Sequence, residues 1–403
     1  MSIQTADRVR VPKNTRPLWG DRYPELGHGP VPVDYLYKQE FFDLEREKIF
    51  RNCWLYVGRT EEFPARNGFL VREVEICKAS ILLTRDDAGN LSAFHNICKH
   101  RLNKLTYERS GSAASFVCNY HAWAYDRKGT LRHVPDEEAF PELEKSNCNL
   151  TPVAVDQWRG FIFINLNPKP RETLMEYLED IPKLLEEFPF EDLTGAVHSE
   201  TPIGVNWKVG AQTNMESYHA ERLHSASMLL ETDEINNPGN RPIDLRLFKR
   251  HRMFAYGGKD GPRLTYPTPL FKNMKEFGDS RILPGSNLCG DERWGGDVWF
   301  IFPNLTLSTA RGNFSTLSYW PLTRNTSRLR FHWYFQQPKS MRQVFADKCE
   351  YQRQANILVN DIWAGDRVQE GIETQAADVM QLSDSELCIR HEYHVYMAEL
   401  GLT

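Results

Sequence analysis

The chain has 403 residues, 41% of them hydrophobic and 26% charged, and its formal net charge is -5. This composition predicts a globular protein of two or three domains and argues against a disordered chain. The weak negative charge excludes the basic footprint of a nucleic-acid-binding protein. No apolar run approaches the roughly 18 residues of a membrane helix, and the N-terminus lacks the apolar core of a signal peptide, so we expect a cytoplasmic protein.

The first part of the chain predicts an arm followed by a small β domain. Residues 1–40 are rich in proline and glycine and predict an extended arm that packs on the rest of the protein. Residues 41–50 predict a short helix. Apolar or alternating runs then predict strands at residues 68–72, 80–84 and 161–164. We therefore expect an all-β domain over residues 41–166.

A second domain is expected over residues 167–403. The two prolines in Asn167-Pro168-Lys169-Pro170 favour an extended linker over a helix or a strand. Helices are predicted beyond it at residues 174–185, 213–230 and 340–369. Strands are predicted at residues 298–302, 314–320 and 329–335. The fold class is therefore α+β.

The most specific motif combines two cysteines with two histidines. Cys98 and His100 are followed after 17 residues by Cys118 and His121, which gives the pattern C-x-H-x17-C-x2-H. Two thiolates can hold one iron and two neutral imidazoles a second iron, and this mixture raises the reduction potential of a 2Fe-2S cluster. The same residue types also suit a single zinc ion, although zinc sites usually present their cysteines as C-x2-C. The motif alone leaves the cluster and the zinc ion as alternatives.

With the residues that follow it, this motif resembles the Rieske domain of ring-hydroxylating oxygenases. The similar segments are residues 121–126 (HAWAYD) and residues 158–163 (WRGFIF). One position departs from the family, because a glycine often stands where this chain has Leu102. The resemblance implies a Rieske-type 2Fe-2S cluster held by Cys98, His100, Cys118 and His121.

The second domain carries a histidine pair, His219 and His224, that resembles the H-x4-H metal pair of the same family. Residues five apart lie about 140° apart on a regular helix, so both can face one metal only where the helix is bulged or broken. The pair alone is a weak indication in a chain with 12 histidines. The resemblance implies that both are ligands of a mononuclear ferrous iron, which also needs a carboxylate.

Asp361 is the expected carboxylate ligand, because the segment around it is similar to the C-terminal metal segment of the family. Three other acids compete with it: Asp366, Asp378 and Asp384.

Glu216 stands about one helical turn before His219, where a carboxylate can hydrogen-bond a liganding imidazole and set its tautomer. In the family, an acid at this position bridges the metal histidine to a cluster histidine of a neighbouring subunit in a trimer. The resemblance therefore implies that Glu216 is an electron-transfer bridge. The usual residue is Asp, and Glu resembles the branch that acts on quaternary ammonium compounds.

Two further features are less specific. The segment His391-Glu392-Tyr393-His394 has metal-binding residue types, but a terminal, mostly polar segment is expected at the surface. Seven aromatic residues are candidates to line a substrate pocket, although each alone is more typical of a core: Phe254, Tyr256, Trp299, Phe302, Trp320, Trp333 and Trp363.

The resemblance spans nearly the whole chain and implies the large (alpha) oxygenase subunit of a Rieske non-haem iron system. It implies a helix-grip catalytic domain, in which an antiparallel sheet surrounds a long helix. Such a mono- or dioxygenase uses dioxygen and electrons from a ferredoxin or a flavin reductase to hydroxylate or dihydroxylate an aromatic substrate. No G-x-G-x-x-G follows a predicted strand, so the reductase is expected to be a separate protein. A homotrimer is expected, with or without a small beta subunit.

Other functions remain open at this point. Oxidative N- or O-dealkylation, including that of quaternary ammonium substrates, needs the same ligands, and Glu216 favours it. A zinc-stabilised binding protein with a lipid-type cavity is an alternative from a different class. A pure electron-transfer protein would leave His219, His224 and Asp361 without a role.

Overall fold

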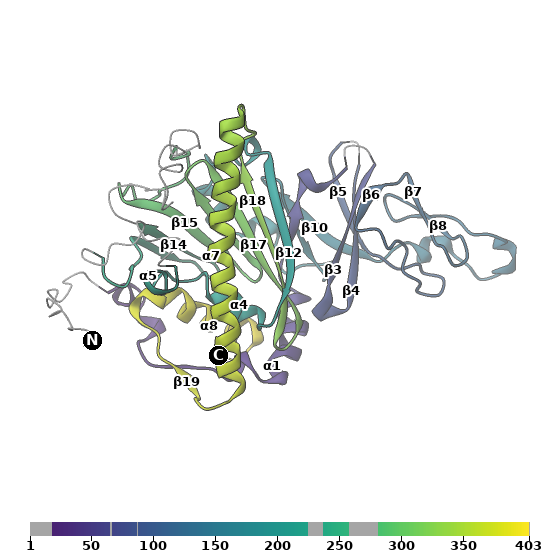
Figure 1. The fold of residues 1–403 in the computed structure, drawn as a ribbon. Helices are drawn as coiled ribbons and strands as arrows, with labels where there is room; N and C mark the ends of the chain where they lie inside the picture. The colour runs from purple at the N-terminus through teal and green to yellow at the C-terminus, as the bar shows by residue number, and fades with distance from the viewer. Residues whose placement is uncertain (1–17, 65–66, 87, 225–236, 258–280, 403) are drawn as a thin grey trace, which may run out of the picture.

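The computed structural model describes residues 18–64, 67–86, 88–224, 237–257 and 281–402. These residues form a narrow β-rich body that ends in a tip and a broader body in which one long helix crosses an antiparallel sheet (Figure 1). The combination is the α+β class that the sequence predicts. Among the described helices, none is both long and apolar enough to cross a membrane.

The narrow body contains a seven-stranded antiparallel sheet with the strand order β2-β11-β10-β5-β4-β3-β6. Its strands are β2 (Leu55–Arg59), β3 (Gly68–Val74), β4 (Ala79–Arg85), β5 (Leu91–His95), β6 (Ser110–Ser112), β10 (Pro152–Trp158) and β11 (Phe161–Asn165). A smaller sheet at the tip is formed by β7 (Ser115–Val117), β8 (Ala124–Asp126) and β9 (Leu131–His133). The three strands predicted in this region are confirmed as β3, β4 and β11.

The broad body contains the second seven-stranded antiparallel sheet, in the order β12-β18-β17-β16-β15-β14-β13. Its strands are β12 (Gly195–Ile203), β13 (Asp244–Leu247), β14 (Arg252–Gly257), β15 (Trp294–Ile301), β16 (Leu305–Ala310), β17 (Asn313–Thr323) and β18 (Thr326–Phe335). The helix α7 (Met341–Glu373) crosses this sheet, and Ser340 caps its first turn by accepting a hydrogen bond from the backbone N–H of Gln343. The predicted long helix and long strands are confirmed.

The shorter helices agree less well with the sequence prediction. The predicted helix at residues 41–50 is confirmed as α1 (Gln39–Leu44) and a following π-helical turn (Glu45–Phe50). The predicted run 174–185 is two single turns, α2 (Leu174–Tyr177) and α3 (Ile181–Leu184), because Glu179 between them has a left-handed backbone with φ of 55°. The C-terminal helix α8 (Leu387–Leu400) buries ten of its residues, so the expectation of a surface segment at residues 391–394 is wrong.

The N-terminal segment packs along the broad body. β1 (Val31–Pro32) pairs with β19 (Val379–Met380), close to the C-terminal end of α7. The Asp384 carboxylate accepts hydrogen bonds from the backbone N–H groups of Trp19 and Gly20 at 3.0 and 2.8 Å. Residues 1–17 of the predicted arm lie outside the described residues.

The two faces of the large sheet meet different parts of the protein, because side chains alternate along each strand. Trp333 lies under α7, with its ring centroid 6.4 Å from that of Tyr351. On the opposite face, the Phe314 ring lies 6.0 Å from Phe161 of β11. A continuous apolar core therefore joins the two bodies on the face of the sheet that is turned away from α7.

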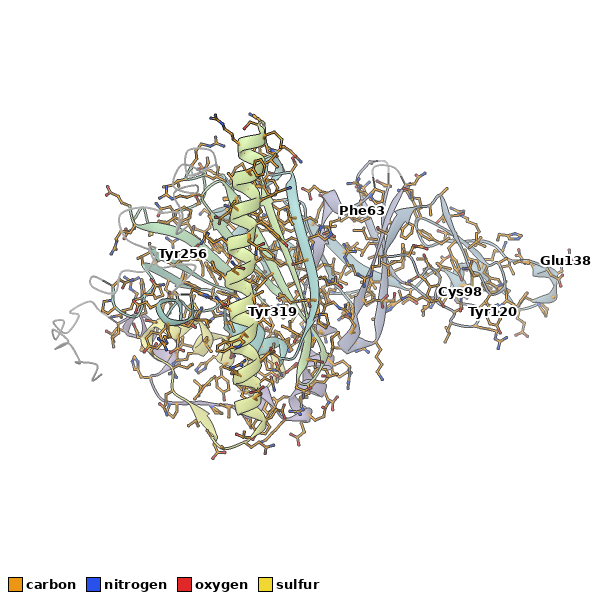
Figure 2. The ribbon with its side chains drawn as sticks, viewed as in Figure 1. Phe63, Cys98, Tyr120, Glu138, Tyr256 and Tyr319 are labelled. Carbon is orange, nitrogen blue, oxygen red and sulfur yellow. The ribbon has the colours of Figure 1, made fainter. Side chains whose placement is uncertain are left out.

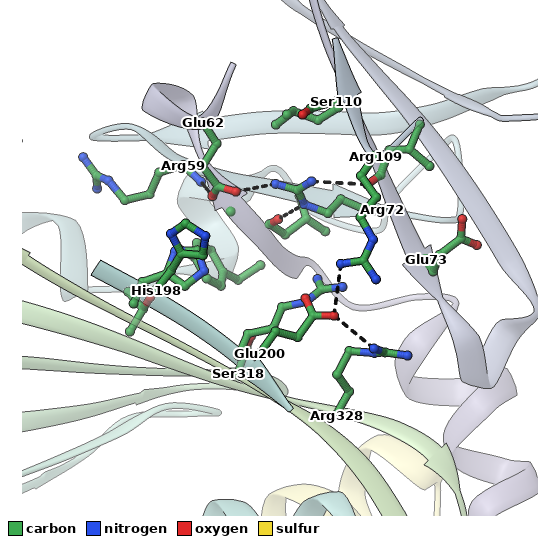
Figure 3. A pocket seen from close by; sticks show the side chains of 18 of the residues that line it. Arg59, Glu62, Arg72, Glu73, Arg109, Ser110, His198, Glu200, Ser318 and Arg328 are labelled. Carbon is green, nitrogen blue, oxygen red and sulfur yellow. Dashed lines mark hydrogen bonds and ion pairs between the residues drawn. The ribbon is translucent and has the colours of Figure 1, made fainter. Parts of the chain in front are cut away.

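Beside this apolar contact, a cleft of about 760 Å³ lies between the two bodies (Figure 3). Glu200 of β12 accepts hydrogen bonds from Arg328 and Arg330 of β18 at 3.0 and 2.9 Å. Arg109 of the narrow body lies 3.5 Å from the same carboxylate, so an ion pair crosses the cleft. The cleft is on the opposite side of the sheet from α7.

Candidate metal centres

The first candidate centre lies in the tip of the narrow body, where two loops face each other (Figure 2). Cys98 and His100 follow β5, whereas Cys118 and His121 lie between β7 and β8. The two cysteines are only 1% and 2% exposed, and the two imidazole centroids are 4.5 Å apart. The His100 ring also stacks on Trp123 at 4.9 Å. The structure thus brings together the four residues of the C-x-H-x17-C-x2-H motif.

The two loops make the same turn. The backbone N–H of Leu102 donates to the carbonyl of Cys98 at 3.1 Å, and that of Ala122 donates to the carbonyl of Cys118 at 2.9 Å. Both Leu102 and Ala122 have left-handed backbones, with φ of 60° and 56°. Glycine adopts this conformation without the steric cost of a Cβ atom, which is a physical reason for a glycine where this chain has Leu102.

Polar groups surround the two sulfur atoms. The hydroxyl of Tyr125 lies 3.5 Å from Cys98 Sγ, and the amide of Asn103 lies 3.7 Å from Cys118 Sγ. Burial opposes ionisation of Cys118, but hydrogen bonds from the backbone N–H groups of Tyr120 and His121 lower the pKa of its thiol overall. Such contacts suit thiolate ligands and tune the potential of a cluster. Sequence reasoning did not single out Tyr125 or Asn103, although Tyr125 lies in the HAWAYD segment.

The arrangement fits a two-iron cluster better than a single ion. Burial, followed by the neighbouring His121, lowers the pKa of His100 and so favours the neutral imidazole that binds metal. The buried Nδ1 atom of His100 has no hydrogen-bond partner among the described residues. Across the described part of the chain, only one group of three His, Cys, Asp or Glu ligand atoms gathers within 4.8 Å, and it lies elsewhere. The Cys and His ligands at the tip are thus spread more widely than a tetrahedral zinc ion requires.

The second candidate centre is that compact group, between α5 (Ala220–Leu223) and α7. The Nε2 atoms of His219 and His224 are 3.1 Å apart, and Asp361 Oδ1 lies 3.5 and 3.0 Å from them. His224 and Asp361 are 2% and 4% exposed. Lone pairs on two imidazoles and a carboxylate repel at this distance unless a proton or a cation lies between them. Two imidazoles and one carboxylate are the ligand set of non-haem ferrous iron.

The two histidines converge from the two ends of α5, so the expected bulge or break between them is replaced by a single helical turn that ends at both. α4 (Trp207–Gln212) ends before the site, and His219 and His224 are the residues immediately before and after α5. The predicted helix at 213–230 is therefore wrong for residues 213–219 and confirmed for residues 220–223, and residues 225–230 lie outside the described residues. Polar side chains replace the helical hydrogen bonds here, because Ser217 Oγ donates to the carbonyl of Asn240 at 2.6 Å.

Glu216 lies beside His219 within this non-helical segment. Its carboxylate contacts Nδ1 of His219 and accepts a hydrogen bond from the His219 backbone N–H at 3.1 Å. Burial opposes protonation of the ring, but Glu216 and then Asp361 raise the pKa of His219 overall. A proton held on Nδ1 leaves the Nε2 lone pair directed toward His224 and Asp361.

The competing acids lie away from the two histidines. Asp384 binds the N-terminal segment, as described above, and forms an ion pair with Arg241 at 2.6 Å. Asp366 lies next to Gly204. Asp378 is exposed, and its backbone carbonyl accepts a hydrogen bond from Val33. Of the four acids considered, the structure brings only Asp361 to the histidine pair.

The other sequence candidates divide between core and surface. His391 is buried, burial lowers its pKa to about 3, and it does not join a metal cluster of the described residues. The strand register places three of the aromatic candidates, Phe254, Tyr256 and Trp333, on the sheet face under α7. It places Trp299 and Trp320 on the opposite face. Trp363 is 52% exposed on α7, and Phe302 is buried after β15.

Two family models match the chain in the regions of these centres. Residues 190–401 match the ring hydroxylating alpha subunit (catalytic domain), and residues 53–148 match the Rieske [2Fe-2S] domain. The two matches contain the second and the first candidate centre, respectively.

Similar proteins fall into two substrate groups. A glycine betaine monooxygenase oxygenase subunit from Chromohalobacter salexigens is 31% identical over 228 residues, which are 56% of this chain and 50% of that protein. The large component of a naphthalene 1,2-dioxygenase system from Ralstonia sp is 26% identical over 72% of this chain and 68% of that protein. The chain spans about half the length of the first curated relatives that it matches.

Solved structures share the fold over nearly the whole chain. A quaternary ammonium Rieske monooxygenase, described with carnitine oxidation and inter-subunit electron transfer, has a TM-score of 0.73 at 18% identity, over 92% of this chain and 94% of that chain. Naphthalene 1,2-dioxygenase from Rhodococcus sp. also has a TM-score of 0.73, at 20% identity, over 93% of this chain and 94% of that chain. The predicted combination of a Rieske domain and a helix-grip domain is thereby confirmed.

Proposed function

The chain belongs to the family of ring-hydroxylating oxygenase alpha subunits, and we propose that it is the oxygenase component of a Rieske non-haem iron system. One observation carries the proposal: a single chain combines a paired Cys/His loop motif with a separate, compact group of two histidines and an aspartate. An electron carrier would need only the first centre. A zinc-stabilised binding protein would not need the second centre, and its Cys and His ligands at the first centre would not need to be spread so widely.

The proposal assigns each ligand a role. Cys98 and Cys118 hold one iron of the 2Fe-2S cluster, and His100 and His121 hold the other. His219, His224 and Asp361 hold the mononuclear iron. An iron held there would supply dioxygen activation with two electrons and two protons. Monohydroxylation would give hydroxylated substrate and water, whereas dihydroxylation would place both oxygen atoms in a cis-diol.

The protein's own residues prepare this second centre. Glu216 holds the Nδ1 proton of His219, which fixes the ring and leaves Nε2 for the metal. Asp361 supplies a negative oxygen from α7, and burial of Asp361 and His224 limits the access of water. Aromatic side chains on the same face of the sheet, such as Phe254 and Trp333, can hold a flat or a cationic substrate.

The two centres lie in different bodies of one chain, with the Cys98 tip far from α5 and α7 (Figures 1 and 2). We infer that each mononuclear iron receives electrons from the cluster of a neighbouring copy, through Glu216, in a homotrimer with or without a small beta subunit. A similar monooxygenase is described with inter-subunit electron transfer, which supports this proposal. A ferredoxin or a flavin reductase would dock near His100 and His121 at the tip.

The division of the chain also remains a proposal: an arm over residues 1–40, a Rieske domain over residues 41–166 and a catalytic domain over residues 167–403. The family matches at residues 53–148 and 190–401 support it, because each lies within one proposed domain. A cytoplasmic location is also a proposal, supported by the absence of a disulfide among the described cysteines.

The leading substrate proposal is an aromatic compound that is hydroxylated or dihydroxylated on its ring. Oxidative dealkylation, above all of a quaternary ammonium compound, is the second candidate, because Glu216 stands where the family usually has Asp and because glycine betaine and carnitine monooxygenases are similar. Product analysis separates them. Ring attack gives a phenol or a cis-diol, whereas oxidation next to nitrogen releases an aldehyde such as formaldehyde.

The experiment that tests the function combines spectra, metal counts and turnover. We expect a reddish-brown protein with about three irons per chain and a Rieske-type EPR spectrum after reduction with dithionite. With a reductase, it should turn over a member of a panel of naphthalene, salicylate, anthranilate, glycine betaine and carnitine. A colourless protein that contains zinc and no iron would overturn the proposal.

A further inference from the structure

The non-helical segment at residues 213–219 carries Glu216 and His219, and because it lacks helical hydrogen bonds of its own it is held by side chains such as Met215, which is 3% exposed in the apolar core. Its backbone makes isolated turns, such as the hydrogen bond from Asn214 N–H to the carbonyl of Ala211 at 3.1 Å. One side-chain tie to another element is the hydrogen bond from Ser217 to Asn240, at the end of the segment near His219. The position of the metal ligands thus depends on what holds the beginning of the segment.

Tyr319 of β17 provides that second tie. The Asn214 side-chain amide donates to the Tyr319 hydroxyl at 2.9 Å. Tyr319 is only 3% exposed, and it belongs to one of the central strands of the sheet. The same amide of Asn214 also donates to Thr213 Oγ1 at 3.0 Å. A rigid strand is thereby connected to a segment that lacks regular structure of its own.

Gly210 allows Tyr319 to approach α4 closely, and α7 packs against the same region at Gly365. A Cβ atom on Gly210 of α4 would lie 2.6 Å from the Tyr319 ring, so only glycine admits the ring at this position. A Cβ atom on Gly365 would lie 3.4 Å from Val205 and 3.9 Å from Thr213, which shows that α7 packs against the same region one turn after Asp361. Burial, followed by the charge of Asp361, raises the pKa of Tyr319 well above its ordinary value, so the hydroxyl stays neutral and keeps its proton.

We propose that Tyr319 is a positioning residue of the mononuclear iron site. Its hydrogen bond with Asn214 holds the segment that carries His219 in place relative to Asp361 on α7. The inference rests on the proposed function, because it takes His219, His224 and Asp361 as iron ligands. Tyr319 acts at a distance from the metal, and its loss should weaken iron binding without affecting the 2Fe-2S cluster.

The test is the affinity for ferrous iron of Tyr319→Phe, measured by chelator competition under anaerobic conditions. The absorbance of the 2Fe-2S cluster in the same sample counts correctly folded chains. Loss of one hydrogen bond of ordinary strength should weaken binding about three- to tenfold. Tyr334→Phe is the matched control, because Tyr334 is a buried tyrosine on the adjacent strand that points to the opposite face and contacts His332 at 3.0 Å. It should bind iron as the wild-type protein does.

A double-mutant cycle with Asn214→Ala tests the route. If the hydrogen bond carries the effect, Tyr319→Phe should cause no further loss of affinity in the Asn214→Ala background. Wild-type affinity in Tyr319→Phe, an equal loss in Tyr334→Phe, or additive losses in the cycle would overturn the inference. These outcomes are distinct from failure of the proposed function, in which the wild-type protein itself would bind no third iron.

Discussion

The carboxylate of Glu216 meets His219 at two atoms, the ring Nδ1 and the backbone N–H, the latter at 3.1 Å. One acid therefore orients the imidazole and also fixes the backbone that enters α5. Glutamate is long enough to make both contacts from a position three residues earlier. This geometry gives Glu216 a local structural role in addition to the proposed electron-transfer bridge.

Replacing Glu216 with glutamine should weaken the binding of the mononuclear iron. Glutamine keeps the length of the side chain, but its neutral amide holds the Nδ1 proton less strongly, and its NH2 group would face a backbone donor. Loss of such a partner typically lowers metal affinity about 10- to 100-fold, which chelator competition can measure. Glu370→Gln, an exposed acid on α7, is the control. Unchanged iron affinity in Glu216→Gln would contradict the orienting role.

The sequence predicted the residues of both centres better than it predicted the local structure that positions them. The Cys98 and His100 loop follows a strand and a turn, and such short-range patterns are visible in a motif. The tie from Asn214 to Tyr319 joins residues 105 positions apart, and no local pattern encodes it. The predicted helix fails at residues 213–219 for the same reason, because tertiary contacts of Ser217 and Asn214 replace the helical bonds there.

Asp361 and Asp384 should respond differently to substitution by asparagine. Asp361→Asn removes the carboxylate whose Oδ1 lies 3.5 and 3.0 Å from the Nε2 atoms of His219 and His224, and we expect it to lose most of the mononuclear iron. Asp384→Asn weakens the attachment of Trp19 and Gly20 instead, and should retain the iron while the N-terminal segment becomes more sensitive to protease. Iron counting and limited proteolysis distinguish the two. Iron loss in Asp384→Asn alone would reverse the assignment.

Leu102→Gly should stabilise the tip slightly. A residue with a Cβ atom in the left-handed conformation destabilises the folded protein by about 1–2 kcal/mol, and glycine removes this strain. The greater freedom of glycine in the unfolded chain offsets about 0.5–1 kcal/mol of that stabilisation. Leu102 is 67% exposed, so little packing is lost in the isolated chain. Thermal bleaching of the cluster absorbance should occur at a slightly higher temperature. Leu102→Val should bleach at a lower temperature, because a β-branched residue tolerates positive φ poorly. A higher bleaching temperature for Leu102→Val than for Leu102→Gly would show that the backbone of Leu102 is not strained.

The buried pair of Glu45 and Lys208 should be sensitive to the loss of one partner. Both side chains are 0% exposed, and Glu45 also accepts hydrogen bonds from Trp207 Nε1 and the Tyr396 hydroxyl, each at 2.6 Å. Glu45→Gln leaves the Lys208 charge unpaired, and removal of one member of a buried pair typically costs about 3–5 kcal/mol. The double variant Glu45→Gln/Lys208→Met should recover part of this loss in denaturant unfolding. A double variant less stable than Glu45→Gln would contradict the explanation.

Asp297 predicts a specific pH dependence of stability. Burial, together with a smaller effect of Asp244, raises the pKa of its carboxyl to about 6, although Trp294 Nε1 donates to it at 2.7 Å. The ordinary value is 3.8, so between pH 4 and pH 6 the folded protein holds a proton that the unfolded chain has released. This contribution to stability is complete below pH 4 and is lost as the pH rises through 6.

The size of the effect follows from the shift of about two pH units, which corresponds to about 3 kcal/mol. The variant Asp297→Asn carries no titrating proton at this position. Between pH 4 and pH 7, the free energy of unfolding should therefore decrease in the wild-type protein by about 3 kcal/mol more than in Asp297→Asn. The comparison of the two profiles removes the contribution of every other titrating group, including the metal ligands. Parallel profiles would show that the pKa of the Asp297 carboxyl is not raised in the folded protein, because its contacts with Trp294 and Asn287 offset burial.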